Sequence, residues 1–136
     1  MRKSKLVRGE EIKWELGQEP PLKVKRAVSG KTADSPRLEM KRAFIPPGAR
    51  NQRHYHVNCD AGMFVLKGRL KIFIGPSHEM EETIAEEGDF VFVPAGAIHG
   101  LMNLSNTEPA ELVSTKPNVS HSEQEGTMFV EPRWDK

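Results

Sequence analysis

Two histidines separated by one residue, His54 and His56, are the side chains of this sequence best suited to chemistry. Residues two apart on an extended strand point to the same face, so both imidazoles would project together while Tyr55 points away. Two neutral imidazoles side by side are half of a transition-metal site. The competing interpretation is a pair of exposed strand histidines. A third histidine, His99, follows the turn Pro-Ala-Gly-Ala-Ile, and taken alone it is better explained as a turn residue hydrogen-bonded to backbone.

Short apolar runs punctuated by glycine and proline predict the strands that would position these histidines. Period-two alternation predicts two short edge strands in the first 28 residues and a third strand over residues 37–45. Two runs separated by Lys67-Gly68 predict a tight hairpin. Further strands are expected at 83–85, 90–93, 99–104 and 110–115. Because no amphipathic helix is evident, we expect an all-β antiparallel sandwich or barrel.

Two segments resemble the signature motifs of the cupin superfamily. The residues that match the motifs are Gly48, His54, His56 and Gly68 in the first, and Gly88, Pro94, Gly96, His99 and Asn103 in the second. The resemblance implies a small jelly-roll barrel, the cupin-type double-stranded β-helix, in which His99 lies beside His54 and His56 as a third metal ligand. We accordingly divide the chain into N-terminal strands or an arm (1–35), a cupin barrel (36–116) and a C-terminal tail that docks on the barrel (117–136).

The sequence departs from the cupin pattern at Ala61, where the family usually has a glutamate ligand. Alanine cannot ligate. Asp60 is adjacent, but on an extended strand it points to the opposite face, so it could be a fourth ligand only if the chain bulges there. We expect a three-histidine site, with addition of Asp60 and loss of metal as the alternatives. Cys59 is better explained as a small buried apolar residue than as a thiolate ligand.

A site with three neutral ligands leaves a divalent ion with its full charge and with open coordination positions, which favours an anionic, chelating substrate. The ligand count resembles that of three-histidine iron cupins, among them thiol and β-diketone dioxygenases. The resemblance therefore implies a metal-binding cupin that acts on a small organic anion, with an iron-dependent dioxygenase as the first prediction. Iron is the expected metal, and Zn, Mn, Ni and Cu are alternatives. The alternative functions are a non-catalytic metal or small-molecule binding cupin and a Lewis-acid lyase or isomerase.

Apolar side chains near the motifs are candidates for the wall of a substrate pocket, although ordinary barrel core is the alternative for each. These candidates are Phe44, Met63, Phe73, Phe92 and Met102. Arg42 could meet an anionic substrate if it faces inward, or it could lie on the outer face. The sequence does not identify a catalytic acid or base.

Composition and charge indicate a single soluble domain that we expect in the cytoplasm. The 136 residues include 20 basic and 19 acidic residues, interspersed along the chain, which gives no reason to expect nucleic acid or a membrane as partner. A single cysteine excludes an internal disulfide. The runs at 63–66 and 90–93 are apolar on both faces, and no helix is available to cover the outer one. We therefore expect a homodimer joined sheet to sheet, to which the N-terminal strands could contribute.

Overall fold

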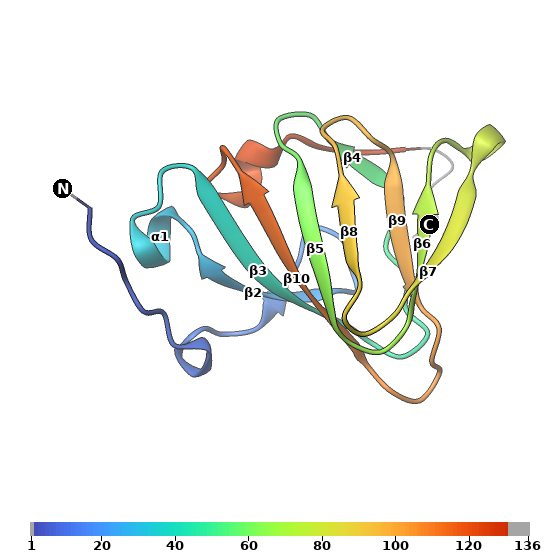
Figure 1. The fold of residues 1–136 in the computed structure, drawn as a ribbon, viewed down its shortest axis with the longest axis horizontal. Coiled ribbons are helices and arrows are strands. Elements are labelled where there is room, and N and C mark those ends of the chain that lie inside the picture. The colour runs from blue at the N-terminus through green and yellow to red at the C-terminus, as the bar shows by residue number, and fades with distance from the viewer. Residues whose placement is uncertain (1, 131–136) are drawn as a thin grey trace.

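Two antiparallel sheets lie face to face in the computed structural model, which describes residues 2–130 (Figure 1). The strands of the first sheet, in spatial order, are β1 (Glu15–Leu16), β2 (Lys23–Val28), β3 (Leu38–Ile45), β10 (Ala110–Pro117), β5 (Ala61–Lys67) and β8 (Phe90–Val93). Those of the second are β11 (Thr127–Phe129), β4 (His54–His56), β9 (His99–Asn103), β6 (Leu70–Ile74) and β7 (Glu81–Ala85). The predicted all-β class is confirmed.

Helix within residues 2–130 is limited to single turns. These are α1 (Gly30–Ala33) and the 3-10 segments Gly9–Glu11, Ser77–Glu79 and Ser122–Glu125. None of the described helices is long and apolar enough to cross a membrane.

The core lies between the two sheets and follows the period-two alternation of their strands. Ala43 and Ile45 of β3 are buried there, and they meet Leu70 and Ile72 of β6 in one apolar cluster. Intervening residues face outward, so the register of each strand decides which side chains can reach a site inside the barrel.

The predicted hairpin at Lys67-Gly68 is wrong. β5 pairs with β10 and β8, whereas β6 pairs with β7 and β9, so the chain passes here from one sheet to the other. Gly68 has φ of 87°, and a Cβ at this position would lie 2.9 Å from the Cβ of Ala110. A tight glycine turn between two apolar runs is thus the signal of a sheet-to-sheet corner as well as of a hairpin, and local sequence does not distinguish them.

The two ends of the described chain both contribute strands. Among residues 2–35, only Glu15–Leu16 and Lys23–Val28 are strands, and β2 joins β3 of the same chain. Part of the segment expected to be a docking tail forms β11, which pairs with β4 in the register Thr127↔His56 and Phe129↔His54. Residues 127–129 therefore lie beside the histidine strand, as its neighbour at the edge of the second sheet.

Candidate metal centre

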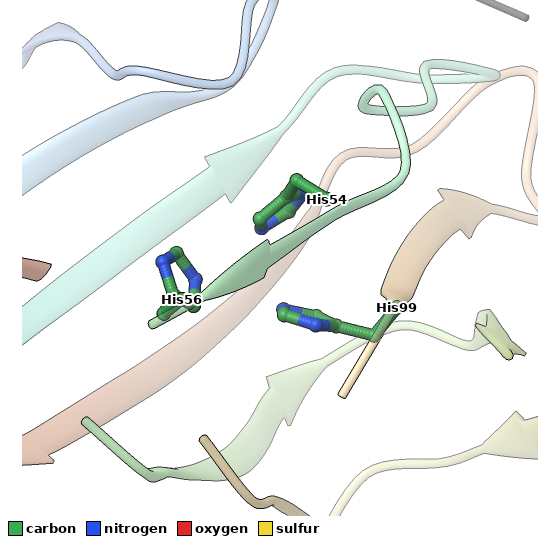
Figure 2. A group of neighbouring side chains, drawn as sticks. All are labelled: His54, His56 and His99. Carbon is green, nitrogen blue, oxygen red and sulfur yellow. The ribbon is translucent and has the colours of Figure 1, made fainter. Parts of the chain in front are cut away.

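Three histidines converge inside the barrel from two neighbouring strands (Figure 2). His54 and His56 lie on β4 with one residue between them, and His99 begins β9 directly opposite His54. One ring nitrogen from each of the three lies within 4.8 Å of the others. The ring centroids of His54 and His99 are 4.4 Å apart, and those of His54 and His56 are 4.9 Å apart. The structure thus brings together the three histidines that the sequence proposed as ligands.

Hydrogen bonds at Nδ1 orient all three rings. His54 Nδ1 donates to the Gln52 carbonyl (2.7 Å) and His99 Nδ1 donates to the Ala97 carbonyl (2.9 Å), because a carbonyl oxygen can only accept. His56 Nδ1 lies 2.9 Å from Oγ1 of Thr127. The Thr127 hydroxyl donates onward to the side-chain oxygen of Gln18 (3.2 Å), which leaves its oxygen to accept from His56.

These hydrogen bonds leave Nε2 of each ring as the atom available for ligation. An imidazole held through Nδ1 by a carbonyl or hydroxyl is the usual arrangement of a metal-ligating histidine. The donor set therefore fits a divalent transition metal, which His54, His56 and His99 would hold through their Nε2 atoms.

Burial keeps two of the candidate ligands neutral. It lowers the pKa of His56 to about 3, with further lowering by the positive charges of Lys116 and of protonated His54. Burial and the charge of protonated His54 lower the pKa of His99 to about 4. Because a ligating imidazole must be unprotonated, His56 and His99 are ready to bind a metal at neutral pH.

A carboxylate that the sequence analysis missed enters the site from the loop between β1 and β2. Oε1 of Glu19 lies 2.9 Å from Nε2 of His54 and 4.0 Å from Nε2 of His56, and its side chain is only 15% exposed. Burial raises the pKa of Glu19, but attraction by His54, the hydrogen bond from His54, and the charges of Lys116 and Lys41 together hold it well below its usual value. The sequence carried one weak signal, an acid just before Pro20-Pro21 between two short strands, but nothing local connects it with His54.

Neither Ala61 nor Asp60 brings a ligand atom to the three histidines. Ala61 is buried and lines the same cavity as Glu19 and His54, so it supplies space but no ligand atom. The alternative ligand Asp60 is exposed, and its Oδ1 accepts a hydrogen bond from the backbone N–H of Ala95 (2.8 Å). Its carboxylate holds the turn before His99 and is not part of the histidine group. Burial raises the pKa of the Cys59 thiol, in keeping with the expected apolar role.

A small cavity of about 50 Å³ adjoins the histidine group at His54. Apolar side chains form most of its wall, among them Met63, Leu101 and Leu112, and Lys41 and Lys116 add two cations. Met63 is thus the one predicted pocket residue that borders this cavity.

The other four predicted pocket residues lie on strand faces that point away from it. Phe92 is 70% exposed, and Phe44 lies on the outer face of β3, where its ring is 6.0 Å from that of Trp14. Phe73 and Met102 alternate with the core residues Ile72 and Leu101, so they belong to the opposite face of the second sheet. These pocket assignments were based on residue type, whereas strand register sets the face of the sheet on which each side chain lies.

Beneath the histidines lies a cluster of buried charges that the sequence analysis also missed. Lys41 Nζ lies 3.2 Å from Oε2 of Glu125 and 3.3 Å from Oε1 of Glu39, and Lys116 Nζ lies 2.8 Å from Oε1 of Glu125. That oxygen is 3.5 Å from Nδ1 of His56. Burial raises the pKa of Glu125, but Lys41 and Lys116 more than offset it and lower the pKa to about 2.

Lys41, and not Arg42, is therefore the cation of β3 that faces the interior. Arg42 lies on the outer face, where its guanidinium is 2.6 Å from the carboxylate of Glu111. Of the two orientations considered for Arg42, the structure shows the outward one.

Comparison with curated proteins gives two partial relatives. The chain is 30% identical over 70 residues to germin-like protein subfamily 3 member 2 of Arabidopsis thaliana. The matched region is 51% of this chain and 31% of the relative. It is also 38% identical over 52 residues to an uncharacterized protein of Aquifex aeolicus (strain VF5). This matched region is 38% of this chain and 40% of the relative. The chain thus spans less than half the length of these curated relatives.

Similar solved structures cover nearly the whole described fold. KdgF from Halomonas sp. superposes with a TM-score of 0.72 at 17% identity, covering 89% of this chain and 98% of that chain. The polyketide cyclase RemF from Streptomyces resistomycificus superposes with a TM-score of 0.70 at 20% identity, covering 90% of this chain and 89% of that chain. Oxalate decarboxylase from Bacillus subtilis superposes with a TM-score of 0.73 at 18% identity, covering 95% of this chain and 34% of that chain. At these identities the likeness is one of fold.

The family follows from the sequence and the fold together. The two-sheet barrel has the jelly-roll architecture that the motifs implied, and it superposes on the structures just described. A model of the cupin domain matches residues 42–116, which is more than half of the chain and includes all three histidines. The chain belongs to the cupin family.

Proposed function

We propose that the protein is a divalent-metal-dependent enzyme that acts on a small organic anion. The observation that carries this proposal is the convergence of three Nδ1-anchored histidines beside an internal cavity. Anchored rings keep their Nε2 atoms in place before the metal arrives, which favours binding. The cavity provides room beside the metal for the reacting part of a substrate.

The charges around the site favour an anionic substrate. Two lysines, Lys41 and Lys116, and three glutamates, Glu19, Glu39 and Glu125, are connected by ion pairs to one another or to the histidines. When all five are ionised they carry a net charge of −1, and a divalent ion changes this to +1. Burial raises the pKa of Glu39, which shifts the balance further toward positive charge. An anionic ligand at the metal would neutralise the excess, because uncompensated buried charge is costly.

Dioxygenation with iron is the first candidate reaction. Bound iron would supply the redox chemistry for reaction of a coordinated organic anion with oxygen. The chain would position the anion through the charges of Lys41 and Lys116 and would exclude water with the apolar wall that includes Met63. The small cavity limits what enters to the reacting end of the substrate.

A Lewis-acid lyase or isomerase is the second candidate. The observation that favours it is the buried Lys116–Glu125 pair next to His56, which could donate or accept a proton close to the metal. Zinc or manganese would be adequate for this chemistry, since no electron transfer is needed.

Metal content and turnover test these candidates together. The purified protein should contain, or bind after chelator treatment, one transition-metal ion per chain, and His99→Ala should lose it whereas His78→Ala, at an exposed turn, should not. Iron-loaded protein should consume oxygen with a member of a panel of thiols, β-diketones and hydroxy acids. Turnover without oxygen by the zinc form would support the Lewis-acid reaction instead. Metal binding without turnover of any panel member under either condition would indicate a binding protein.

A further inference from the structure

The loop between β1 and β2, residues 17–22, reaches across the barrel to the histidines. Besides the contact of Glu19 with His54, the side-chain oxygen of Gln18 accepts a hydrogen bond from the Thr127 hydroxyl that orients His56. Two consecutive residues of this loop therefore contact two ligand histidines, one directly and one through Thr127.

The position of this loop is fixed by the barrel. Leu22 and Val24, which follow the loop, are buried in the apolar core. Within the loop, the N–H of Gly17 donates to the Leu22 carbonyl (2.9 Å) and the N–H of Leu22 donates to the Glu19 carbonyl (3.1 Å). A Cβ on Gly17 would lie 3.2 Å from Cγ1 of Val24, so the chain passes close to the core at this point. The Glu19 carboxylate is thus held at the histidines by the same packing that holds β2.

The distances around Glu19 are those expected between ligands of one ion. Two ligand atoms about 2.1 Å from a metal lie about 3 Å apart when adjacent in an octahedron and about 4.2 Å apart when opposed. Oε1 of Glu19 lies 2.9 Å from Nε2 of His54 and 4.0 Å from Nε2 of His56. Both separations are short enough for the oxygen and the two nitrogens to bind the same ion.

We propose that Glu19 is a ligand of the metal, so that the β1–β2 loop completes a coordination sphere that the barrel strands leave one carboxylate short. This inference rests on the proposed metal binding. Metal binding and the packed loop then stabilise each other, because the ion adds a bond to Glu19 and the packed loop keeps the carboxylate in place. Hydrogen exchange at the Gly17 and Leu22 amides should slow when metal binds.

The test compares Glu19→Gln with Glu11→Gln, a matched change at an exposed position of the same N-terminal segment. Glutamine keeps the shape and an oxygen that can accept from His54, so it preserves a purely structural contact while removing the anionic ligand. Cobalt(II) affinity, measured by competition with a chelator, should fall at least about tenfold for Glu19→Gln, and the visible cobalt absorption should change. Glu11→Gln should match wild type in both, and thermal unfolding of the metal-free variants would show that both fold.

A second variant moves the carboxylate to another lining position of the same cavity. In Glu19→Ala combined with Ala61→Glu, the new side chain enters the space beside His54, and recovery of cobalt affinity relative to Glu19→Ala alone would support the ligand role. Wild-type affinity and absorption in both Glu19→Gln and Glu19→Ala would overturn it. Failure of the wild-type protein to bind any transition metal would instead overturn the proposed function, and the two failures are therefore distinguishable.

Discussion

Lys116 and Glu125 form a buried ion pair, 2.8 Å between Nζ and Oε1, next to the candidate metal ligand His56. Their side chains are 6% and 1% exposed, so neither charge is compensated by water. Glu125 also contacts Lys41, and the three groups support one another. Ion pairs between buried charges thus connect this part of the site, which makes it sensitive to loss of a single partner.

Replacing Lys116 by methionine should destabilise the protein strongly. Methionine fills a similar volume but leaves the Glu125 carboxylate with one cation fewer, and breaking a buried pair in this way costs about 3–5 kcal/mol. Arg69→Met, which breaks the exposed pair with Glu86, should cost less than about 1 kcal/mol. Urea unfolding at neutral pH measures both. Equal effects of the two substitutions would show that the buried pair adds no particular stability.

The metal-free protein should lose stability as pH falls from about 6.5. The pKa values of His56 and His99 are lowered to about 3 and about 4 in the folded state, so between these values and 6.5 the unfolded chain binds protons that the folded chain does not. Each such histidine lowers the free energy of unfolding by about 1.4 kcal/mol per pH unit in its window. The loss attributed to Glu125, whose pKa is lowered to about 2, begins only below about pH 4.5.

Urea unfolding at pH 7.5, 6.5 and 5.5 measures this decline, and a His99 variant separates the histidine contribution from that of Glu39, whose raised pKa acts on stability in the opposite direction. His99→Gln should show a shallower decline over this range than wild type, and exposed His78→Gln should decline as wild type does. A slope that His99→Gln leaves unchanged would contradict the burial of a neutral His99.

Alternation within a strand predicted that His54 and His56 share a face, and the cupin resemblance added His99. His54 and His56 share a face because they are two apart on β4, and the motif spacing placed His99 next to them. The strand positions over 37–45, 90–93, 99–104 and 110–115 agree with β3, β8, β9 and β10 to within two residues. These features depend on local sequence, and period-two patterning specifies them directly.

The remaining parts of the site depend on packing that local patterns do not encode. Glu19 reaches His54 only because β2 joins the sheet and carries the preceding loop over the barrel. Lys41 and Lys116 alternate with outward residues on their strands, but a lysine at such a position is usually solvent-exposed, and only their glutamate partners allow burial here. Phe92 was misplaced for the converse reason, because a large apolar side chain was expected inside and is 70% exposed.

Thr127→Val should weaken metal binding although Thr127 is not itself a ligand. Valine has the same shape but cannot accept the hydrogen bond from Nδ1 of His56, so the ring loses the contact that orients it. Loss of such a partner typically reduces metal affinity about 10–100-fold. Chelator competition with cobalt(II) measures the change, and Thr83→Val at an exposed position of β7 is the control. Identical affinity in the two variants would mean that strand packing alone orients His56.

The outer face of β5 and β8 should form the contact of a homodimer. Phe90 and Phe92 are 79% and 70% exposed, and the ring of Phe90 is 4.8 Å from that of Phe64, so an apolar patch lies on the side of the sheet away from the core. Patches of this kind on a soluble protein usually mark an interaction surface, and a two-fold pairing would cover the same patch on both copies.

Light scattering after size exclusion should give a dimer for wild type and a monomer for Phe90→Ser with Phe92→Ser. Ile84→Ser, an exposed apolar residue on the other sheet, should remain dimeric. The double variant should keep its metal affinity, because Val91 and Val93 between and beyond these residues face the interior and stay in place. A monomeric wild-type protein, or a double variant that remains dimeric, would show that this face is not where two copies meet.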